Sequence, residues 1–254
     1  MTLAQRITSA WPGSGASRSA PMELASPSAT RRLARIAGLL YLIVAIFGGL
    51  AEGVIEPGVY VAGDAAKTAG NVVANAGLVR FGVAADLLQA TVFLFLGLTL
   101  WLILKDVARN AAGAMVVLMA IATAIICVSG VFEFVGLRVA IDKSFATALG
   151  TAGSNALVLL LLDLQHHGIL VAQIFFGLWL LPLAYLARRS GWFPRGLGFL
   201  LVAGAVCYLV DVTARFLLPD IAPKIGPIVV IAAVAEFYMI GYLLVKGVRV
   251  PRAA

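Results

Sequence analysis

Six long apolar segments limit what this chain can fold into. Three of them, Leu87–Leu104, Ala111–Phe132 and Gly168–Ala187, run for 18, 22 and 20 residues without a charge. A helix needs about 20 apolar residues to cross the ~30 Å hydrocarbon layer of a membrane. The other three, which each carry or adjoin a single acidic residue, are Ile36–Ala51, Gly196–Val210 and Ile225–Val245.

The composition excludes a soluble protein. The chain is 62% hydrophobic and 12% charged, and its mean hydropathy is +1.02. A soluble core of 254 residues cannot hide that much apolar surface. The segments are continuous and rich in Leu and Ala, without the alternation of barrel strands. The sequence therefore predicts an all-α, polytopic membrane bundle of six transmembrane helices in contact with the lipid bilayer.

The basic residues predict the orientation. Of the 19 Lys and Arg residues, 13 fall in the terminal tails and the loops that share their side. By the positive-inside rule that side is cytoplasmic, so both termini are expected inside and the protein is a multi-pass protein of the cell (cytoplasmic) membrane. The net charge of +7 is explained by this asymmetry, and no nucleic-acid partner is predicted. Of the 12 acidic residues, only Glu23 and Asp106 lie on the cytoplasmic side.

The chain is expected to form one domain. Residues 1–30, rich in Ser, Ala, Gly and Pro, are predicted to be a disordered cytoplasmic tail. The transmembrane domain is expected over 31–248, followed by a cytoplasmic tail over 249–254. No signal peptide is predicted, because no apolar stretch precedes Arg31, and Met22 is an alternative start of translation.

Charged and polar residues gather near the predicted outer face. Each apolar segment carries one carboxylate there, and charges at bilayer depth persist mainly where they pair, face a cavity or act on a ligand. Glu236 is the deepest and is expected near the midplane. The candidate pocket comprises Glu52, Arg80, Asp86, Glu133, Arg138, Asp163, Gln165, His166, His167, Asp211, Arg215 and Glu236.

Three functions remain open for this layer. The leading hypothesis is an outward-facing acidic and arginine-containing pocket that binds or translocates a small solute or ion. The alternative is a membrane enzyme with a metal held by His166 and His167 together with nearby carboxylates, although adjacent histidines on a helix point about 100° apart. A third is a structural or partner-binding subunit, in which acids and arginines neutralise each other and the protein forms an oligomer. No nucleophile elbow, Walker loop or dinucleotide fingerprint is found, so a non-enzymatic role is favoured and no cofactor is predicted.

Local patterns give further expectations. Glu56-Pro57-Gly58 predicts a turn after the first helix, and Asp64 is expected to cap a short helix. Asp211 and Arg215 are four residues apart, which predicts an ion pair within one helix. Close packing between helices is expected at Gly136, Gly168, Gly177, Gly198 and Gly204.

Several blocks of sequence resemble a known family. They are RIAGLLYLI (35–43), GDAAKTAGNVVAN (63–75), RFGVAADLL (80–88), FFGLWLLPLAYLARRSGWFPRGLG (175–198) and CYLVD (207–211). Over about residues 31–218 the chain resembles the bacterial membrane family catalogued as domain of unknown function 4386. The resemblance implies an integral membrane protein of bacteria and no established activity. The family pattern often has a histidine where this chain has Gln165, and here the histidines stand at 166 and 167.

Overall fold

The computed structural model describes residues 27–248, and every regular element among them is a helix. Of the tail predicted over 1–30, residues 1–26 lie outside the described residues and 27–30 belong to the first helix; the tail predicted over 249–254 also lies outside them. The elements are α1 (Pro27–Leu50), the π-helix η2 (Ala51–Ile55), α2 (Glu56–Val59), α3 (Ala65–Ala74), α4 (Ala76–Leu104), α5 (Arg109–Ile141), α6 (Lys143–Ser190), α7 (Arg195–Leu217), α8 (Ala222–Ile225), the 3-10 helix η3 (Gly226–Val229) and α9 (Val230–Val245).

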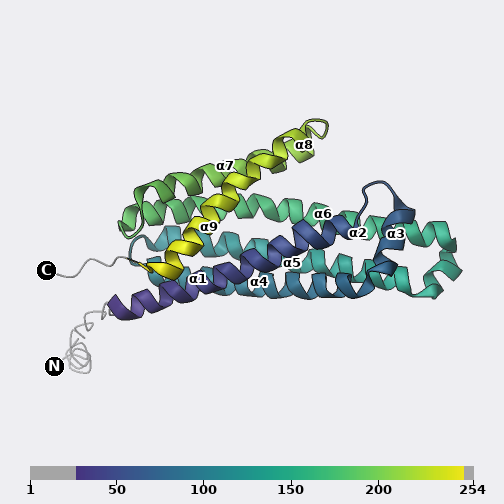
Figure 1. Ribbon diagram of the computed structural model, residues 1–254, viewed down its shortest axis with the longest axis horizontal. Helices are drawn as coiled ribbons and strands as arrows, with labels where there is room; N and C mark the ends of the chain where they lie inside the picture. Colours follow the sequence, from purple (N-terminus) through teal and green to yellow (C-terminus); the bar gives the residue numbers. More distant parts are fainter. Residues whose placement is uncertain (1–26, 249–254) are drawn as a thin grey trace, which may run out of the picture.

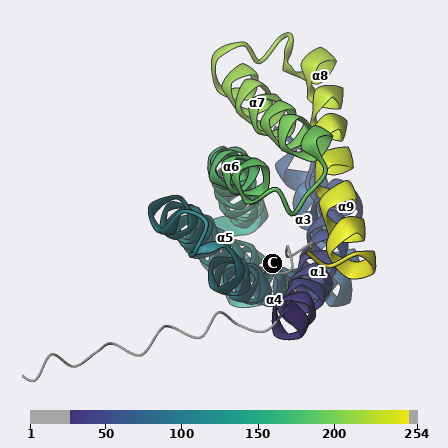
Figure 2. The same cartoon turned by 90° about the vertical axis from the view of Figure 1, so that its left-hand side faces the viewer.

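Six stretches of these described residues are long and apolar enough to cross a membrane, as the sequence predicts. They begin at Ser28, Ala76, Arg109, Lys143, Arg195 and Ala222. Their long helices pack as a ring in the order α1, α4, α5, α6, α7, α9, and α9 returns to contact α1 (Figure 2). The beginning of α1 and the end of α9 lie at the same end of this ring (Figure 1), where Gly247 approaches Arg31. That end is called the terminal end below, and the opposite one the far end.

Small residues let the helices approach closely. A Cβ added to Gly168 of α6 would lie 2.2 Å from the Ser129 hydroxyl oxygen of α5, and one added to Gly204 of α7 would lie 2.9 Å from the Cα of Ala232 in α9. Helix association in lipid depends on such close packing, because the bilayer supplies little hydrophobic drive between helices. The other predicted close-packing positions also meet a neighbouring helix, so the prediction is confirmed for Gly136, Gly168, Gly177, Gly198 and Gly204.

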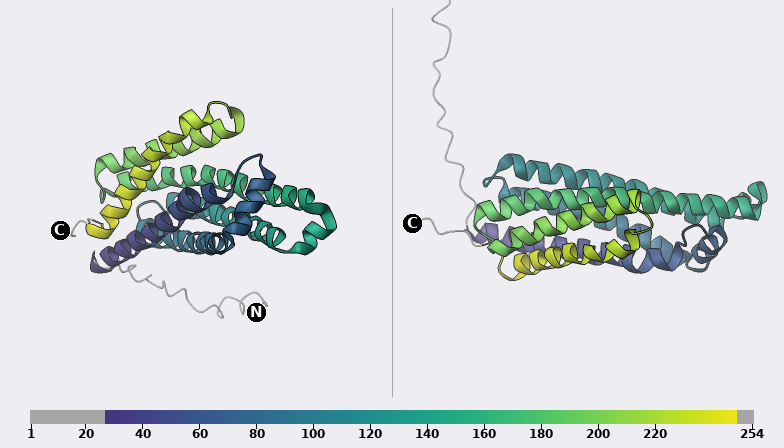
Figure 3. Two further views of the ribbon diagram at one scale, coloured as in Figure 1. Left: turned by 45° about the vertical axis from the view of Figure 1, so that its right-hand side comes forward. Right: turned by 90° about the horizontal axis from the view of Figure 1, so that it is seen from above.

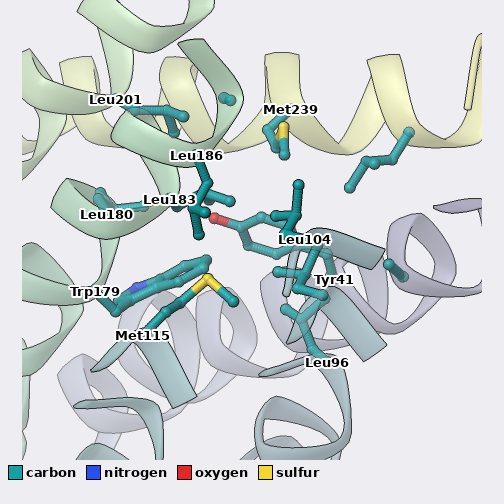
Figure 4. Packing of buried hydrophobic residues seen from close by; sticks show 14 of the residues in the cluster. Tyr41, Leu96, Leu104, Met115, Trp179, Leu180, Leu183, Leu186, Leu201 and Met239 are labelled. Atoms are coloured by element: carbon teal, nitrogen blue, oxygen red, sulfur yellow. The ribbon is translucent and has the colours of Figure 1, made fainter. Parts of the chain in front are cut away.

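The main core fills the terminal half of the ring. Tyr41 of α1, Leu100 of α4, Trp179 and Leu183 of α6 and Met239 of α9 are all almost completely buried there. In Figure 4, Tyr41, Trp179, Leu183 and Met239 converge from opposite walls of the bundle. The ring is therefore closed at the terminal end by packed side chains.

The far half differs from a simple bundle because two helices are much longer than a membrane is thick. α5 has 33 residues and α6 has 48, which gives lengths of about 50 Å and about 70 Å at 1.5 Å per residue, before allowing for the break at Gly150. The α5–α6 hairpin projects past α9 at the far end (Figure 3). There it packs with α3 and the start of α4 around a second core, which includes Val72, Val79, Leu137 and Val158.

The connection from α1 to α3 also differs from expectation. The predicted turn at Glu56-Pro57-Gly58 is wrong: the helix of α1 continues through η2 and α2 as far as Val59, and Pro57 is accommodated in the first turn of α2. The chain then turns at residues 60–64, and α3 begins with the predicted cap, in which the Asp64 carboxylate accepts a hydrogen bond from the Lys67 backbone N–H at 3.0 Å.

Candidate functional site

A cavity of about 440 Å³ lies inside the ring, against the far side of the main core. We call it the α1–α9 cavity. Its walls come from α1, η2, α4, α6, α7, η3 and α9. Its volume is within the range of small-molecule sites in proteins. The side chains that carry its chemistry are Tyr41, Glu52, Gln89, Phe93, Gln173, Phe176, Trp179, Tyr208, Glu236 and Phe237.

The cavity exists because α1 and α9 diverge. The two helices meet closely near the terminal end, where a Cβ on Gly38 would lie 2.9 Å from the backbone N of Leu244. From that crossing they separate toward the far end (Figure 1). Gly49 and Gly53 on the α1 side and Phe237 on the α9 side are exposed lining residues. The α1–α9 cavity therefore reaches the surface between these two helices.

Glu236 is the acidic group at the deep end of the cavity. Counted back from the end of α9 at Val245, it lies about 14 Å from the terminal end, near the middle of a ~30 Å apolar layer. The hydroxyls of Tyr41 and Tyr208 lie close enough to interact with its carboxylate. Among the described residues the Tyr41 hydroxyl nevertheless has no partner at hydrogen-bond geometry. The carboxylate therefore sits beside two phenols and faces the cavity.

Aromatic rings form the wall next to Glu236. Trp179 packs edge-on against Tyr41 and against Phe93, with ring centroids 5.5 Å apart in both pairs. Phe176 meets Phe93 at 6.0 Å and Tyr208 at 6.5 Å. These contacts fix the orientation of the rings, since edge-to-face pairs at this spacing are the preferred geometry.

A second, smaller cavity of about 20 Å³ lies beyond the first toward the far end. We call it the acidic chamber, because four carboxylates line it, each from a different element. They are Glu52 of η2, Glu56 of α2, Asp86 of α4 and Glu133 of α5. Gln165 of α6 lines it as well.

Helix packing brings these side chains together. Gly82 lies one turn before Asp86 in α4, and a Cβ there would stand 3.3 Å from the Glu133 carboxylate and 3.2 Å from Ile55. The missing side chain at this position thus lets α5 and η2 approach α4. The π-turn of η2 holds Glu52 so that it lines both the acidic chamber and the α1–α9 cavity. Single π-turns of this kind occur frequently at functional sites.

A hydrogen-bonded rim joins the α2–α3 connection to α6 beside the acidic chamber. The Tyr60 hydroxyl donates to Asp163 at 2.6 Å, and the Tyr60 ring stacks on His166 at 5.1 Å. His166 in turn pairs through Nδ1 with the Glu56 carboxylate. Burial, and then the hydrogen bond to Asp163, raise the pKa of the Tyr60 hydroxyl above its usual range. Tyr60 therefore remains a hydrogen-bond donor even in alkaline solution.

Asp211 and Arg215 form the predicted ion pair, with Nε of Arg215 2.9 Å from Oδ2 of Asp211. Gln173 donates to the same carboxylate oxygen at 2.8 Å and also lines the α1–α9 cavity. The other carboxylate oxygen, Oδ1, is buried without a partner among the described residues and faces Gly226. This pair thus holds α7 against the wall of the cavity.

Other residues of the predicted pocket lie apart from both cavities. Arg80 and Arg138 are exposed and form no ion pair with any residue of 27–248. His167 is exposed, and its Nδ1 lies 2.7 Å from the backbone carbonyl of Asp163 in its own helix. The cavities are therefore acidic without the arginines that the sequence suggested as counter-charges.

The metal hypothesis gains no support from this geometry. Within residues 27–248, no three His, Cys, Asp or Glu side chains gather closely enough to hold a metal ion. His166 and His167 meet edge-on at 5.3 Å and make their polar contacts in different directions.

Two parts of the site were missed in the sequence. The sequence pattern predicts a turn at Glu56. Its spacing of four residues from Glu52 is the signal that could have placed both carboxylates on one face of a continuing helix. The aromatic wall of Trp179, Phe93 and Phe176 gave no signal, because such residues in an apolar helix look the same whether they face a cavity or lipid.

The fold is that of an integral membrane protein with six described helices long and apolar enough to cross the membrane, and its two cavities are lined by acidic side chains. The family model described as "Domain of unknown function (DUF4386)" matches residues 36–247, and the chain belongs to that family. The match extends beyond residue 218, where the resemblance noted in the sequence ends. No curated protein and no solved structure matches this chain.

Proposed function

We propose that the protein binds a small amphipathic organic cation in the α1–α9 cavity and translocates it across the membrane. The observation that carries this proposal is the pairing of a carboxylate at membrane depth with aromatic walls. Glu236 supplies the charge, and Trp179, Phe93 and Phe176 supply the ring faces and edges around it. Cations are attracted to aromatic faces, and a carboxylate at bilayer depth is costly unless something neutralises it.

The charge of the cavity supports a cationic solute. Among its described lining residues, Glu52 and Glu236 are acidic and none is Lys, Arg or His. An anion would meet two carboxylates and no counter-charge. An organic cation would bring its own apolar surface to the aromatic wall, and its charge would be neutralised by Glu236. A hydrated metal ion would leave that apolar wall unused.

The opening supports access from the membrane as well as from the far side. The gap between α1 and α9 lies along apolar helices, where Phe237 is 56% exposed and Val234 is 52% exposed. A molecule with both apolar and charged parts concentrates at the membrane interface and could reach the cavity through this gap. Packed side chains close the bundle at the terminal end, so this structure would be the state of the transporter that is open toward the far end.

Orientation and location belong to the same proposal. The described basic residues at the terminal end include Arg35, Arg109, Arg188 and Arg195, and this excess favours a cytoplasmic terminal end. The far end, with the acidic chamber, would then face outward from a bacterial cytoplasmic membrane.

Direct binding tests the proposal. The detergent-purified protein is dialysed to equilibrium against tetraphenylphosphonium, and against triphenylphosphine oxide as an uncharged analogue. We expect saturable binding of the cation only. Glu236→Gln should weaken it at least tenfold, because unit charges about 5 Å apart attract by about 3 kcal/mol at an effective dielectric of about 20, and 1.4 kcal/mol is tenfold.

The matched control is Asp106→Asn, an exposed carboxylate in the loop between α4 and α5. It should bind the cation like the wild type. Equal binding by Glu236→Gln and the wild type, or equal binding of the neutral analogue, would overturn the proposed function. Vesicles that contain the purified protein then test translocation. The wild type should accumulate the cation, and Glu236→Gln should abolish this accumulation.

A further inference from the structure

The acidic chamber presents four carboxylates with too few cations to balance them. Glu56 pairs with His166, but no ion pair reaches Asp86 or Glu133 within residues 27–248. Four negative charges around a cavity of about 20 Å³ would repel each other strongly. Carboxylates that share a site relieve such repulsion by holding protons.

Two buried side chains also lack protein partners there. Asp86 is 3% exposed and Gln165 is 6% exposed, both line the chamber, and neither has a hydrogen bond to another described residue. Buried polar side chains in folded proteins are nearly always hydrogen-bonded. A protonated carboxyl group can donate to a neighbouring oxygen, which an ionised one cannot. A proton shared in the chamber, together with water, would give these side chains the hydrogen bonds that they do not make within the described protein.

We propose that the acidic chamber is a proton-binding site that exchanges protons with the far side and passes them through Glu52 to the α1–α9 cavity. The coupling to solute rests on the proposed function, whereas proton binding in the chamber does not. The size of the chamber fits this occupant, since about 20 Å³ accepts a water molecule but no organic solute. No set of metal ligands competes for the site among the described residues.

The route follows contacts in the structure. His166 and Glu56 lie at the rim, where the side chain of His166 is 25% exposed. A hydronium ion gives its proton to a chamber carboxylate, which leaves a neutral carboxylic acid and a water molecule. Glu52 lines both cavities, so a proton bound to Glu52 can be released to water in the α1–α9 cavity and taken up by Glu236.

The described titratable groups that line the chamber or its rim take part in its charge balance. They come from every element around it: Glu52 from η2, Glu56 from α2, Tyr60 from the following turn, Asp86 from α4, Glu133 from α5, and Asp163 and His166 from α6. A cation that binds beside Glu236 requires an ionised carboxylate, so it displaces a proton. Solute and proton would thus exchange, one entering as the other leaves.

Infrared spectroscopy on the unmodified protein makes the first test. We expect a carboxylic-acid C=O stretching band at neutral pH without solute, which shifts in D₂O. Asp86→Asn and Glu133→Gln, singly and together, should reduce this band. Asp220→Asn, an exposed carboxylate at the far end, should leave it unchanged. Absence of the band from the wild type would overturn the proposal even if the variants fail to fold.

A proton count makes the second test. Between roughly pH 5 and pH 9, the wild type should release at least about one more proton per chain than the Asp86→Asn, Glu133→Gln double variant. Identical titration of a folded double variant would refute proton binding in the chamber. Neither experiment has the organic cation in the sample. Both therefore test proton binding in the chamber even if the α1–α9 cavity binds no organic cation.

A pH indicator then tests the coupling. Tetraphenylphosphonium added to the wild type in weak buffer should release protons, and Glu236→Gln should release none. If the cation binds and no proton appears, the coupling is refuted while the proposed function survives. If the cation does not bind at all, the proposed function fails instead.

Discussion

Replacing either partner of the ion pair between Asp211 and Arg215 should lower the stability of the protein, but by different amounts. Asp211 is 1% exposed, whereas the Arg215 side chain is 40% exposed. Replacing Arg215 by Gln leaves a buried carboxylate with Gln173 as its remaining donor, whereas replacing Asp211 by Asn leaves an arginine that water can solvate. We therefore expect Arg215→Gln to be the more damaging change.

The magnitude follows from the geometry. Charges about 4 Å apart attract by about 4 kcal/mol at an effective dielectric of about 20, and breaking a buried pair costs about 3–5 kcal/mol. Because Arg215 is partly exposed, we expect about 2–3 kcal/mol for Arg215→Gln and about 1 kcal/mol for Asp211→Asn. At about 2–4 °C per kcal/mol for a chain of this size, Arg215→Gln should lower the Tm by about 4–12 °C.

Thermal unfolding in one detergent, followed by circular dichroism, measures the effect. The matched control is Arg80→Gln, an exposed arginine at the same end without an ion pair among the described residues. The double variant, Asp211→Asn with Arg215→Gln, should be more stable than Arg215→Gln alone, because it removes the unpaired charge. A Tm of Arg215→Gln equal to that of Arg80→Gln would refute the reasoning.

Two further predictions concern the helix cap and the helix crossings. Hydrogen bonds from Lys67 hold the pKa of Asp64 below its usual value, so the stabilisation of α3 by Asp64 is present above the unfolded-state pKa and is lost as the pH falls through the folded-state pKa. Asp64→Ala should therefore speed hydrogen exchange in α3 at pH 7 but not in strong acid. The control, Asp220→Ala, should leave hydrogen exchange in α3 unchanged at both pH values. Gly204→Leu should cost about 1–3 kcal/mol or prevent folding because of the close Ala232 backbone, whereas Gly241→Leu, where nothing lies within 4 Å, should keep the monodisperse yield of the wild type.

The bundle itself could be predicted because its cause is local. A run such as Ala111–Phe132 is long and apolar enough to cross the membrane as a helix, and that property depends on no distant contact. Gly168 and Gly204 could be predicted as crossing positions because small residues are enriched where membrane helices pack closely, although Gly241 shows that a glycine in an apolar helix need not meet a neighbour. The projecting half of α6 could not be predicted, because hydropathy reports the membrane-crossing part of a helix and is silent about its continuation.

The site depends on how each helix is rotated about its axis. The sequence placed Asp86 and Glu133 at a similar depth, but depth alone does not decide which side chains share a cavity. The unknown rotation of each helix also explains Arg80 and Arg138, which are exposed at the expected end and line neither cavity. Gln165 belongs to the predicted pocket only because of the family resemblance. The pattern of residues alone does not predict that Gln165 is buried in the wall of the chamber.

The divergence of α1 and α9 makes the molecule unequal toward the two halves of the bilayer. The helices touch at Gly38 and separate toward the far end, so in a membrane their gap would border one leaflet only. A compound dissolved in that leaflet meets an open wall, and the same compound in the other leaflet meets packed helices. For any membrane-soluble ligand, occupancy would therefore follow its concentration in a single monolayer, and the rate at which it crosses between monolayers would determine how much of it the protein encounters.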